Sequence, residues 1–264
     1  MNEEINEMDI HPSAVISPHA RLDPSVKVGP FCTIGDHVTI GQETVLVSHV
    51  SLVGQTRIGA RNRIYPFVSI GSPPQDTGYK GEDTRVIIGD DNIIREYSSI
   101  NRATTKQDWE TVIGDGNYIM AYSHIAHDCS LGNKIIMSNL TTLAGHITIG
   151  DYTNLSGLAA VHQFVRIGAH VFVGGKAAIE RDVPPFMITA GDRARLFGIN
   201  RIGLSRHGFS QDTIDGLKKA YRIIWRDNKK LSEGVDQVRK EMEPFPELVT
   251  LLNFVAESER GIMR

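Results

Sequence analysis

Four of the ten histidines gather in one stretch of the chain, with a spacing suited to proton transfer or metal binding. They are His124, His127, His146 and His162. A general base is best oriented by a carboxylate, and Asp128 follows directly after His127. A zinc site needs several ligands that converge on one ion, and no cysteine or carboxylate cluster reinforces these histidines. We therefore predict general-base chemistry at His127 and no bound metal.

Asp128 and Gly145 could assist His127 as a general base, each under one structural condition. Adjacent residues on a strand point to opposite sides, so Asp128 supports His127 only if the chain bends between them. Gly145 has no side chain to block approach, and its backbone N–H is a candidate donor to a developing oxyanion. Both conditions depend on the fold that carries these residues.

A six-residue repeat of aliphatic residues sets that fold. One run goes from Ile10 to Ile70, a second from Ile88 to Ile100 keeps its phase, and a third from Ile113 to Ile179 is one residue out of step. Such hexads are typical of a parallel β-helix, in which each turn of three hexads buries its aliphatic residues against the next turn. Twenty-six hexads predict about nine coils. A turn of about 18 residues also places HIAHDC, LAGH and AVHQF on neighbouring coils, with the four histidines outside the core.

Two loops and a change of pattern divide the chain. Residues 72–86 are rich in Pro and Gly and must leave the coil, and a shorter interruption near 105–111 explains the phase slip. The hexads stop after Pro185, and helical spacing begins after Ser210, a plausible N-cap. Further helices are expected over 231–242 and 247–260. We predict an all-β domain over 1–190 and a small α-helical cap over 191–264.

Composition and charge restrict the class of protein. The chain has 264 residues and no apolar run long enough to span a bilayer, and its acidic N-terminus is unlike a signal peptide, so we expect a cytoplasmic protein. Cys32 and Cys129 occupy inward positions and are expected to be reduced thiols. Residues 193–230 hold ten Lys or Arg and three Asp, a net charge of +7 in a chain of net charge −3. This predicts an acidic partner or a phosphorylated ligand, and argues against nucleic-acid binding.

At this point the motifs resemble a known family. The segments VGPFCTIG, SHIAHDC, LAGH, AVHQF, DVPPF and GLSRHGFS are similar to those of the acyl-carrier-protein-dependent UDP-N-acetylglucosamine O-acyltransferases, which begin lipid A biosynthesis in Gram-negative bacteria. The resemblance covers nearly the whole chain. It implies a homotrimer of left-handed parallel β-helices with active sites in the clefts between subunits.

The resemblance also implies roles for individual residues. His127 matches the general base that takes the proton from the 3-hydroxyl of the sugar, Asp128 its support and Gly145 the oxyanion donor. No cofactor is implied, because the acyl-phosphopantetheine arrives on acyl carrier protein, for which the basic cap is the expected docking surface. The positions implied to line the sugar and acyl sites are Asp76, His124, His146, His162 and Gln163, with Asn200 and Arg206 near the donor and Gly175 and Lys176 at the position that limits acyl length.

Several departures from the family pattern leave alternatives open. Gly78 stands where well-known members have Lys, so either Lys80 supplies the diphosphate contact from a shifted loop or the contact is absent. In the cap, Ile202 replaces a Glu, and His207 replaces the second Arg of a pair. The acceptor is therefore either UDP-N-acetylglucosamine or its 3-amino analogue. Another hexapeptide acyltransferase, using a different nucleotide sugar or a coenzyme A donor, and a zinc carbonic anhydrase are the remaining alternatives.

Overall fold

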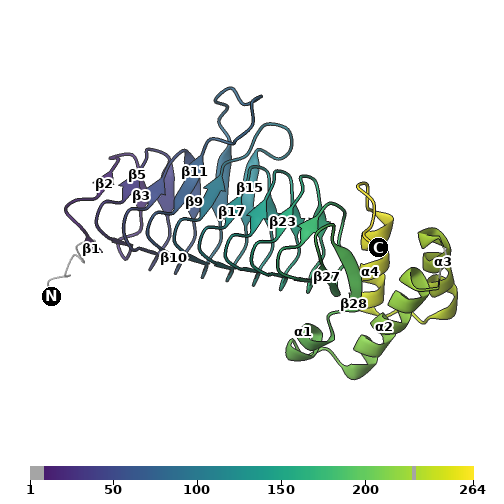
Figure 1. Ribbon diagram of the computed structural model, residues 1–264. Coiled ribbons are helices and arrows are strands. Elements are labelled where there is room, and N and C mark those ends of the chain that lie inside the picture. Colours follow the sequence, from purple (N-terminus) through teal and green to yellow (C-terminus); the bar gives the residue numbers. More distant parts are fainter. Residues whose placement is uncertain (1–8, 228–229) are drawn as a thin grey trace.

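The computed structural model describes residues 9–227 and 230–264. The chain forms a long triangular coil with a helical cap at its C-terminal end (Figure 1). Most of the acidic N-terminal stretch used to predict the location lies outside the described residues, as does Lys229 of the basic stretch. No helix in the described part of the chain has the length and apolar character needed to cross a membrane.

Three sheets form the sides of the coil, and the chain visits them in turn. The first contains β1 (Asp9–Ile10), β4 (Lys27–Val28), β7 (Val45–Leu46), β10 (Arg63–Ile64), β13 (Ile93–Ile94), β16 (Tyr118–Ile119), β19 (Ile136–Met137), β22 (Asn154–Leu155) and β25 (Phe172–Val173), then β27 (Met187–Ala190) and β28 (Arg195–Ile199). The second contains β2 (Val15–Ile16), β5 (Thr33–Ile34), β8 (Ser51–Leu52), β11 (Ser69–Ser72), β14 (Ser99–Asn101), β17 (His124–Ile125), β20 (Thr142–Leu143), β23 (Ala160–Val161) and β26 (Ala178–Ile179). The third contains β3 (Arg21–Leu22), β6 (Val38–Ile40), β9 (Gln55–Ile58), β12 (Arg85–Ile88), β15 (Glu110–Ile113), β18 (Ser130–Leu131), β21 (Thr148–Ile149) and β24 (Arg166–Ile167).

The predicted left-handed parallel β-helix is confirmed. The strands from β1 to β26 pair only in parallel, and each repeat aliphatic stacks on the residue one turn away, as Ile119 does on Met137. These aliphatic side chains are almost entirely buried from Val28 onward, because each strand turns its second residue inward. Cys32 and Cys129 are buried free thiols, as predicted, and burial raises the pKa of Cys129 to about 12.

Each corner of the coil carries residues with positive φ, and three sets of stacked side chains define the corners. The loop corner, between the second and third sheets, includes Asp128, His146 and Phe164. The aromatic corner, between the first and second sheets, carries Phe31, His49, Phe67, Tyr97 and Tyr122, whose rings stack at centroid distances of 4.8–4.9 Å. The cap corner, between the third and first sheets, includes Tyr152, His170 and Phe186.

Both predicted loops leave the coil at the loop corner, and their lengths explain the phase of the repeat (Figure 1). Partners in successive turns are normally 18 residues apart, as Asn117 and Ile135 are. Across the first loop, residues 73–84, the separation between Asn62 and Asn92 is 30, so the loop adds two whole hexads. Across the second loop, residues 102–109, the separation between Asn92 and Asn117 is 25. This loop therefore adds one hexad plus one residue to the normal turn of 18. This extra residue is the predicted one-residue slip.

The cap contains α1 (Arg201–Arg206), α2 (Gln211–Trp225), α3 (Leu231–Glu241) and α4 (Pro246–Ala256). Ser210 caps α2 as predicted, accepting a hydrogen bond from the Thr213 amide. The domain boundary predicted at residue 190 falls inside the antiparallel β27–β28 hairpin, and helix begins only at Arg201. The helix predicted over 247–260 was too long: it ends at Ala256, and Gly261, with a φ of 87°, lies in a tail that pairs with Asp182 of the last coil.

Two adjacent residues of β13 test how much the inward stack stabilises the coil. Ile94 is 0% exposed in the stack, whereas Ile93 points outward and is 38% exposed. We expect Ile94→Ala to lower the free energy of unfolding by about 2–5 kcal/mol, because it leaves a cavity among close-packed side chains. The matched change Ile93→Ala should cost less than about 1 kcal/mol. Urea unfolding followed by circular dichroism measures both, and equal losses would contradict the burial pattern.

Candidate functional site

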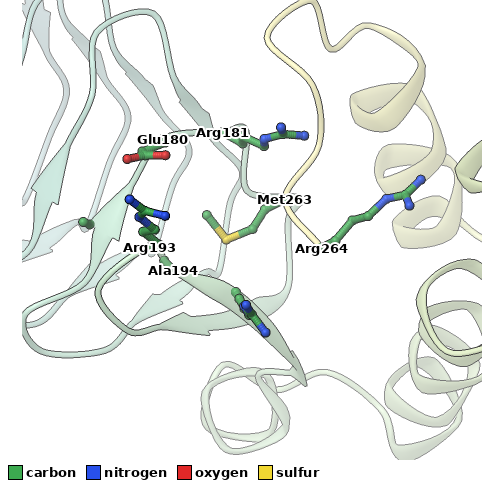
Figure 2. A pocket seen from close by; sticks show the side chains of 8 residues that line it. Glu180, Arg181, Arg193, Ala194, Met263 and Arg264 are labelled. Atoms are coloured by element: carbon green, nitrogen blue, oxygen red, sulfur yellow. The ribbon is translucent and has the colours of Figure 1, made fainter.

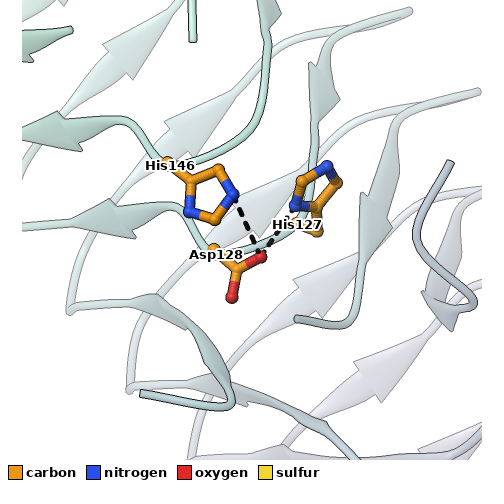
Figure 3. A group of neighbouring side chains, drawn as sticks. All are labelled: His127, Asp128 and His146. Carbon is orange, nitrogen blue, oxygen red and sulfur yellow. Dashed lines mark hydrogen bonds and ion pairs between the residues drawn. The ribbon is translucent and has the colours of Figure 1, made fainter. Parts of the chain in front are cut away.

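His127 and Asp128 meet because the chain bends at the loop corner. Asp128 has a φ of 60°, and its side chain turns back beneath His127 instead of pointing to the opposite side. His127 Nδ1 lies 2.7 Å from Asp128 Oδ2, and His146 Nε2 lies 3.7 Å from the same oxygen (Figure 3). The Asp128 side chain is fully buried, while 12% of the His127 side chain stays accessible. The bend on which the role of Asp128 depended is therefore present.

The buried Asp128 carboxylate is held in its ionised form. Burial alone would raise the pKa of Asp128. The hydrogen bonds from His127 and Thr104 together outweigh this effect, so the pKa of Asp128 lies below its ordinary value. The Thr104 hydroxyl donates to Oδ2 over 2.7 Å, and the Thr104 amide over 3.0 Å. An ionised carboxylate only accepts, so His127 must carry its proton on Nδ1. The Nε2 lone pair of neutral His127 is then free to take a proton from a substrate.

Gly145 lies on the coil next to His127, as the turn length predicted. A Cβ at this position would come within 2.5 Å of His127 Cε1 and 2.8 Å of Nε2, so only glycine allows the imidazole to lie there. The Gly145 carbonyl accepts from the Phe164 amide, whereas within the described residues the Gly145 N–H has no hydrogen-bond acceptor. An unpaired N–H beside a base is available to an oxyanion, and the proposed role of Gly145 stays a prediction.

His146 and His124 flank this pair in an uncharged form. Burial lowers the pKa of both imidazoles, and a protonated His127 would lower the pKa of His124 further. His146 stacks on Phe164 at 4.5 Å, and its Nδ1 lies 2.7 Å from Gln107 Oε1. His124 Nδ1 lies 2.8 Å from the Ser99 hydroxyl. His124 and His146 are therefore held by neutral hydrogen bonds, and Asp128 is the fixed negative charge of the site.

Three residues of the second loop contact the site and were not predicted from the sequence. Thr104 binds Asp128, Lys106 forms an ion pair with Asp76 of the first loop, and Gln107 contacts His146. Asp76 thus lies near the site, and the hydrogen bond from Lys106 is the largest cause of its lowered pKa; its role toward the sugar stays a prediction. The position of the three loop residues could have been inferred from the place of the interruption in the repeat, because the second loop leaves the coil at the same corner as His127, one turn earlier.

His162 and Gln163 lie further along the loop corner, on the next coil. Arg260 of the C-terminal tail donates to His162 Nδ1 over 2.7 Å. A groove of about 500 Å³ runs from His146 to Arg260. Its lining residues are Gln107, His146, Thr148, Phe164, Arg166, Asp182, Glu257, Glu259 and Arg260. The tail thus forms one wall of the groove, which the sequence did not predict.

The remaining predicted site residues lie elsewhere in this chain. Asn200 caps α1 and donates to the His170 carbonyl at the cap corner. Arg206 lines a different pocket, of about 650 Å³, with Ile202 and residues of β27 and α2. Gly175 is exposed, and Lys176 beside it adopts a φ of 58° at the aromatic corner. No hydrogen bond or ion pair in the described ranges joins any of them to His127.

The ligand atoms of His127, Asp128 and His146 all lie within 4.8 Å of one another, close enough to consider a metal ion. Asp128 Oδ2 already accepts hydrogen bonds from His127 and Thr104, and both would have to be displaced from that oxygen. Zinc binds best where its ligands are free and oriented. The geometry therefore favours a base and its supporting carboxylate over a metal centre.

A strongly basic pocket of about 240 Å³ lies away from the histidines, between the last coil and the cap (Figure 2). Its charged lining comes from three segments that are distant in sequence. They contribute Glu180 and Arg181, Arg193 and Arg195, and Arg264. Within the described residues none of these four guanidinium groups forms an ion pair.

Comparison with known proteins agrees with this arrangement. A family model described as Udp N-acetylglucosamine O-acyltransferase, Domain 2, matches residues 182–263. An acyl-[acyl-carrier-protein]–UDP-N-acetylglucosamine O-acyltransferase from Thermodesulfovibrio yellowstonii is 52% identical over 215 residues, which cover 81% of this chain and 83% of the relative.

Solved structures match along the length of the chain. LpxA from Acinetobacter baumannii superimposes with a TM-score of 0.94 at 42% identity, covering 97% of this chain and 100% of that one. The UDP-N-acetylglucosamine acyltransferase from Campylobacter jejuni gives 0.91 at 37% identity, covering 96% and 98%. The resemblance identified from the motifs is thus confirmed, and the chain belongs to the acyl-[acyl-carrier-protein]–UDP-N-acetylglucosamine O-acyltransferase family.

Proposed function

We propose that this protein transfers a 3-hydroxyacyl group from acyl carrier protein to the 3-hydroxyl of UDP-N-acetylglucosamine, the first step of lipid A biosynthesis. The observation that carries the mechanism is the contact of His127 with a buried, ionised Asp128 beside the unpaired N–H of Gly145. Membership of the family supports the substrates. No further cofactor is needed, because the acyl group arrives activated as a thioester on the carrier.

His127 moves one proton during the reaction. Its Nε2 takes the proton of the 3-hydroxyl while the oxygen attacks the thioester carbonyl, and Asp128 stabilises the resulting imidazolium. The tetrahedral intermediate places its negative oxygen where the Gly145 N–H can donate. Collapse of the intermediate breaks the carbon–sulfur bond, and His127 returns the proton to the departing thiolate. The base is thereby restored for the next cycle.

The complete active site needs a second copy of the chain. His127 lies at the loop corner, whereas Asn200 and Arg206 lie near the cap corner, on a different edge of the same prism. The aromatic corner offers an exposed apolar edge for contact between copies, since Phe31, Phe67, Tyr97 and Tyr122 are each about half exposed. Both observations are explained by a homotrimer. In it, the cap residues of one subunit approach His127 of another.

Acyl carrier protein, an acidic partner, would dock on the basic side of the cap. The pocket lined by Arg181, Arg193, Arg195 and Arg264 has Glu180 as its one acidic side chain, so it offers a net positive surface to such a partner (Figure 2). The basic face of α2 is weaker than its sequence indicates, because Lys218, Lys219 and Arg222 share a pocket with Asp215, Asp227 and Glu241. The cytoplasmic location and the absence of a nucleic-acid partner stay predictions.

The role of His127 is tested by turnover. Purified protein is mixed with 3-hydroxyacyl carrier proteins of several chain lengths, UDP-N-acetylglucosamine and its 3-amino analogue, and products are identified by mass spectrometry. The wild type should form an ester with the first sugar, and His127→Ala should lower kcat by about 100- to 10,000-fold while the circular dichroism spectrum is unchanged. Near wild-type turnover by a folded His127→Ala protein would refute the mechanism.

Arg206 lines a separate pocket of the cap, and it tests whether the docking surface extends to that side. Reversing its charge with Arg206→Glu should raise KM for the acyl carrier protein about 5- to 10-fold at low ionic strength, and the difference should shrink as salt screens the attraction. The matched control is Arg21→Glu, on an exposed strand of the first coil. An unchanged KM, or the same rise with Arg21→Glu, would remove Arg206 from the docking surface.

Shared sites between subunits predict complementation. His127→Ala and Arg206→Glu subunits, unfolded together and refolded at equal amounts, should form mixed trimers in which about one quarter of the sites have both native residues. At a carrier concentration far below KM, His127→Ala should be nearly inactive and Arg206→Glu should keep about one tenth to one fifth of wild-type activity, so mixed trimers at slightly above one quarter of wild type should exceed both parents. Activity no higher than that of the parents, in trimers shown to be mixed by native mass spectrometry, would place both residues in one subunit.

A further inference from the structure

Lys106 is a cation beside the histidine site, and it connects the two loops across the loop corner. Its ammonium lies 2.5 Å from Asp76 Oδ2, in the first loop. The Lys106 side chain is 57% exposed, whereas that of Asp76 is 15% exposed. Lys106 also lies close enough to His146 for its charge to help lower the pKa of that imidazole. The pair therefore has one largely covered anion and one solvent-facing cation.

The other basic side chains of the two loops are engaged or point elsewhere. Arg102 donates to the Tyr79 hydroxyl and the Gly71 carbonyl, which fixes its guanidinium between the loop and the coil. Lys80 is exposed, and the hydrogen bond that places it is made by its backbone amide, with Glu82. In the described part of the chain, no ion pair connects the Lys80 ammonium to the residues around His127.

A nucleotide diphosphate brings two or more negative charges into this site. Asp128 and Asp76 already carry negative charge there, so an entering diphosphate is repelled unless a cation accompanies it. A lysine on a flexible stem can leave a carboxylate and bind phosphoryl oxygens with up to three donors. Lys106 is the loop cation in position to make this exchange.

We propose that Lys106 binds the diphosphate of the nucleotide-sugar acceptor, exchanging its ion pair with Asp76 for the phosphoryl oxygens of the ligand. The exchange leaves Asp76 free to accept hydrogen bonds from sugar hydroxyls. Lys106 thereby supplies, from the second loop, the positive charge that the first loop lacks at Gly78. This inference rests on the proposed function for the identity of the acceptor.

Binding of UDP, measured by calorimetry in the absence of acyl donor, tests the proposal without turnover. Lys106→Ala should weaken UDP binding about 10- to 100-fold, the loss expected for charge-assisted hydrogen bonds. Uridine has no phosphate, so any affinity it has should be unchanged. The matched control Lys80→Ala should bind UDP within about twofold of wild type. Equal UDP affinity for Lys106→Ala and wild type would overturn the assignment.

Two further variants separate a ligand contact from a structural connection between the loops. Asp76→Asn also breaks the ion pair but leaves the cation free, so its UDP binding should equal or exceed that of wild type. Equal losses in Asp76→Asn and Lys106→Ala would mean that the connection alone matters, and would overturn the proposal. Adding Gly78→Lys to Lys106→Ala should restore UDP binding at least partly, since a Cβ at Gly78 meets only Asp76 Oδ1, at 3.1 Å.

The same variants keep the two proposals distinguishable. If wild type binds UDP but forms no acylated sugar, the proposed function fails while the binding series still decides the role of Lys106. If wild type is active and Lys106→Ala has an unchanged KM for the acceptor, the inference about Lys106 fails alone. A rise in acceptor KM of about 10- to 100-fold with a nearly unchanged kcat would support both.

Discussion

The fixed length of the turn is the constraint on which the rest of this structure depends. Each repeat aliphatic is buried only if the next turn places another directly above it, so the backbone is held to an 18-residue period. That period brings His127 against Gly145 and carries the groove on to Phe164, although these residues come from successive coils. The geometry of the site follows from the packing of a core that contains none of its residues.

A buried negative charge then decides how the site works. Asp128 occupies a corner position with positive φ, a conformation that Asp adopts more readily than most residues. Its burial is tolerated because Thr104, Thr111 and His127 satisfy the carboxylate and its backbone amide. Two of these partners belong to or adjoin the second loop. The second loop therefore helps to hold the carboxylate that orients His127, in addition to lining the substrate site.

The fold could be predicted from sequence because one period repeats over some 170 residues. The pairing of His127 with Gly145 could also be predicted, since both lie on regular coils. Thr104, Lys106 and Gln107 could not, because a loop has no period and its contacts depend on where its ends leave the coil. The tail beyond Ala256 was mistaken for helix, since its capture by Asp182 through the amide of Met263 and the hydroxyl of Ser258 is a tertiary contact. The separation of Asn200 and Arg206 from His127 likewise depends on which edge of the prism each occupies.

The two ends of the coil differ in protection. In the first coil Ile10, Ile16 and Leu22 are only partly buried, whereas the last coil is covered by the β27–β28 hairpin and the cap. In a solenoid each turn depends on its neighbours, so local opening begins at the less protected end and moves inward. Backbone amides should therefore exchange with solvent along a gradient, fastest near the N-terminal coils. The coils that carry His127 and Gly145 lie deep in that gradient, where fraying of the open end leaves the alignment of the base undisturbed.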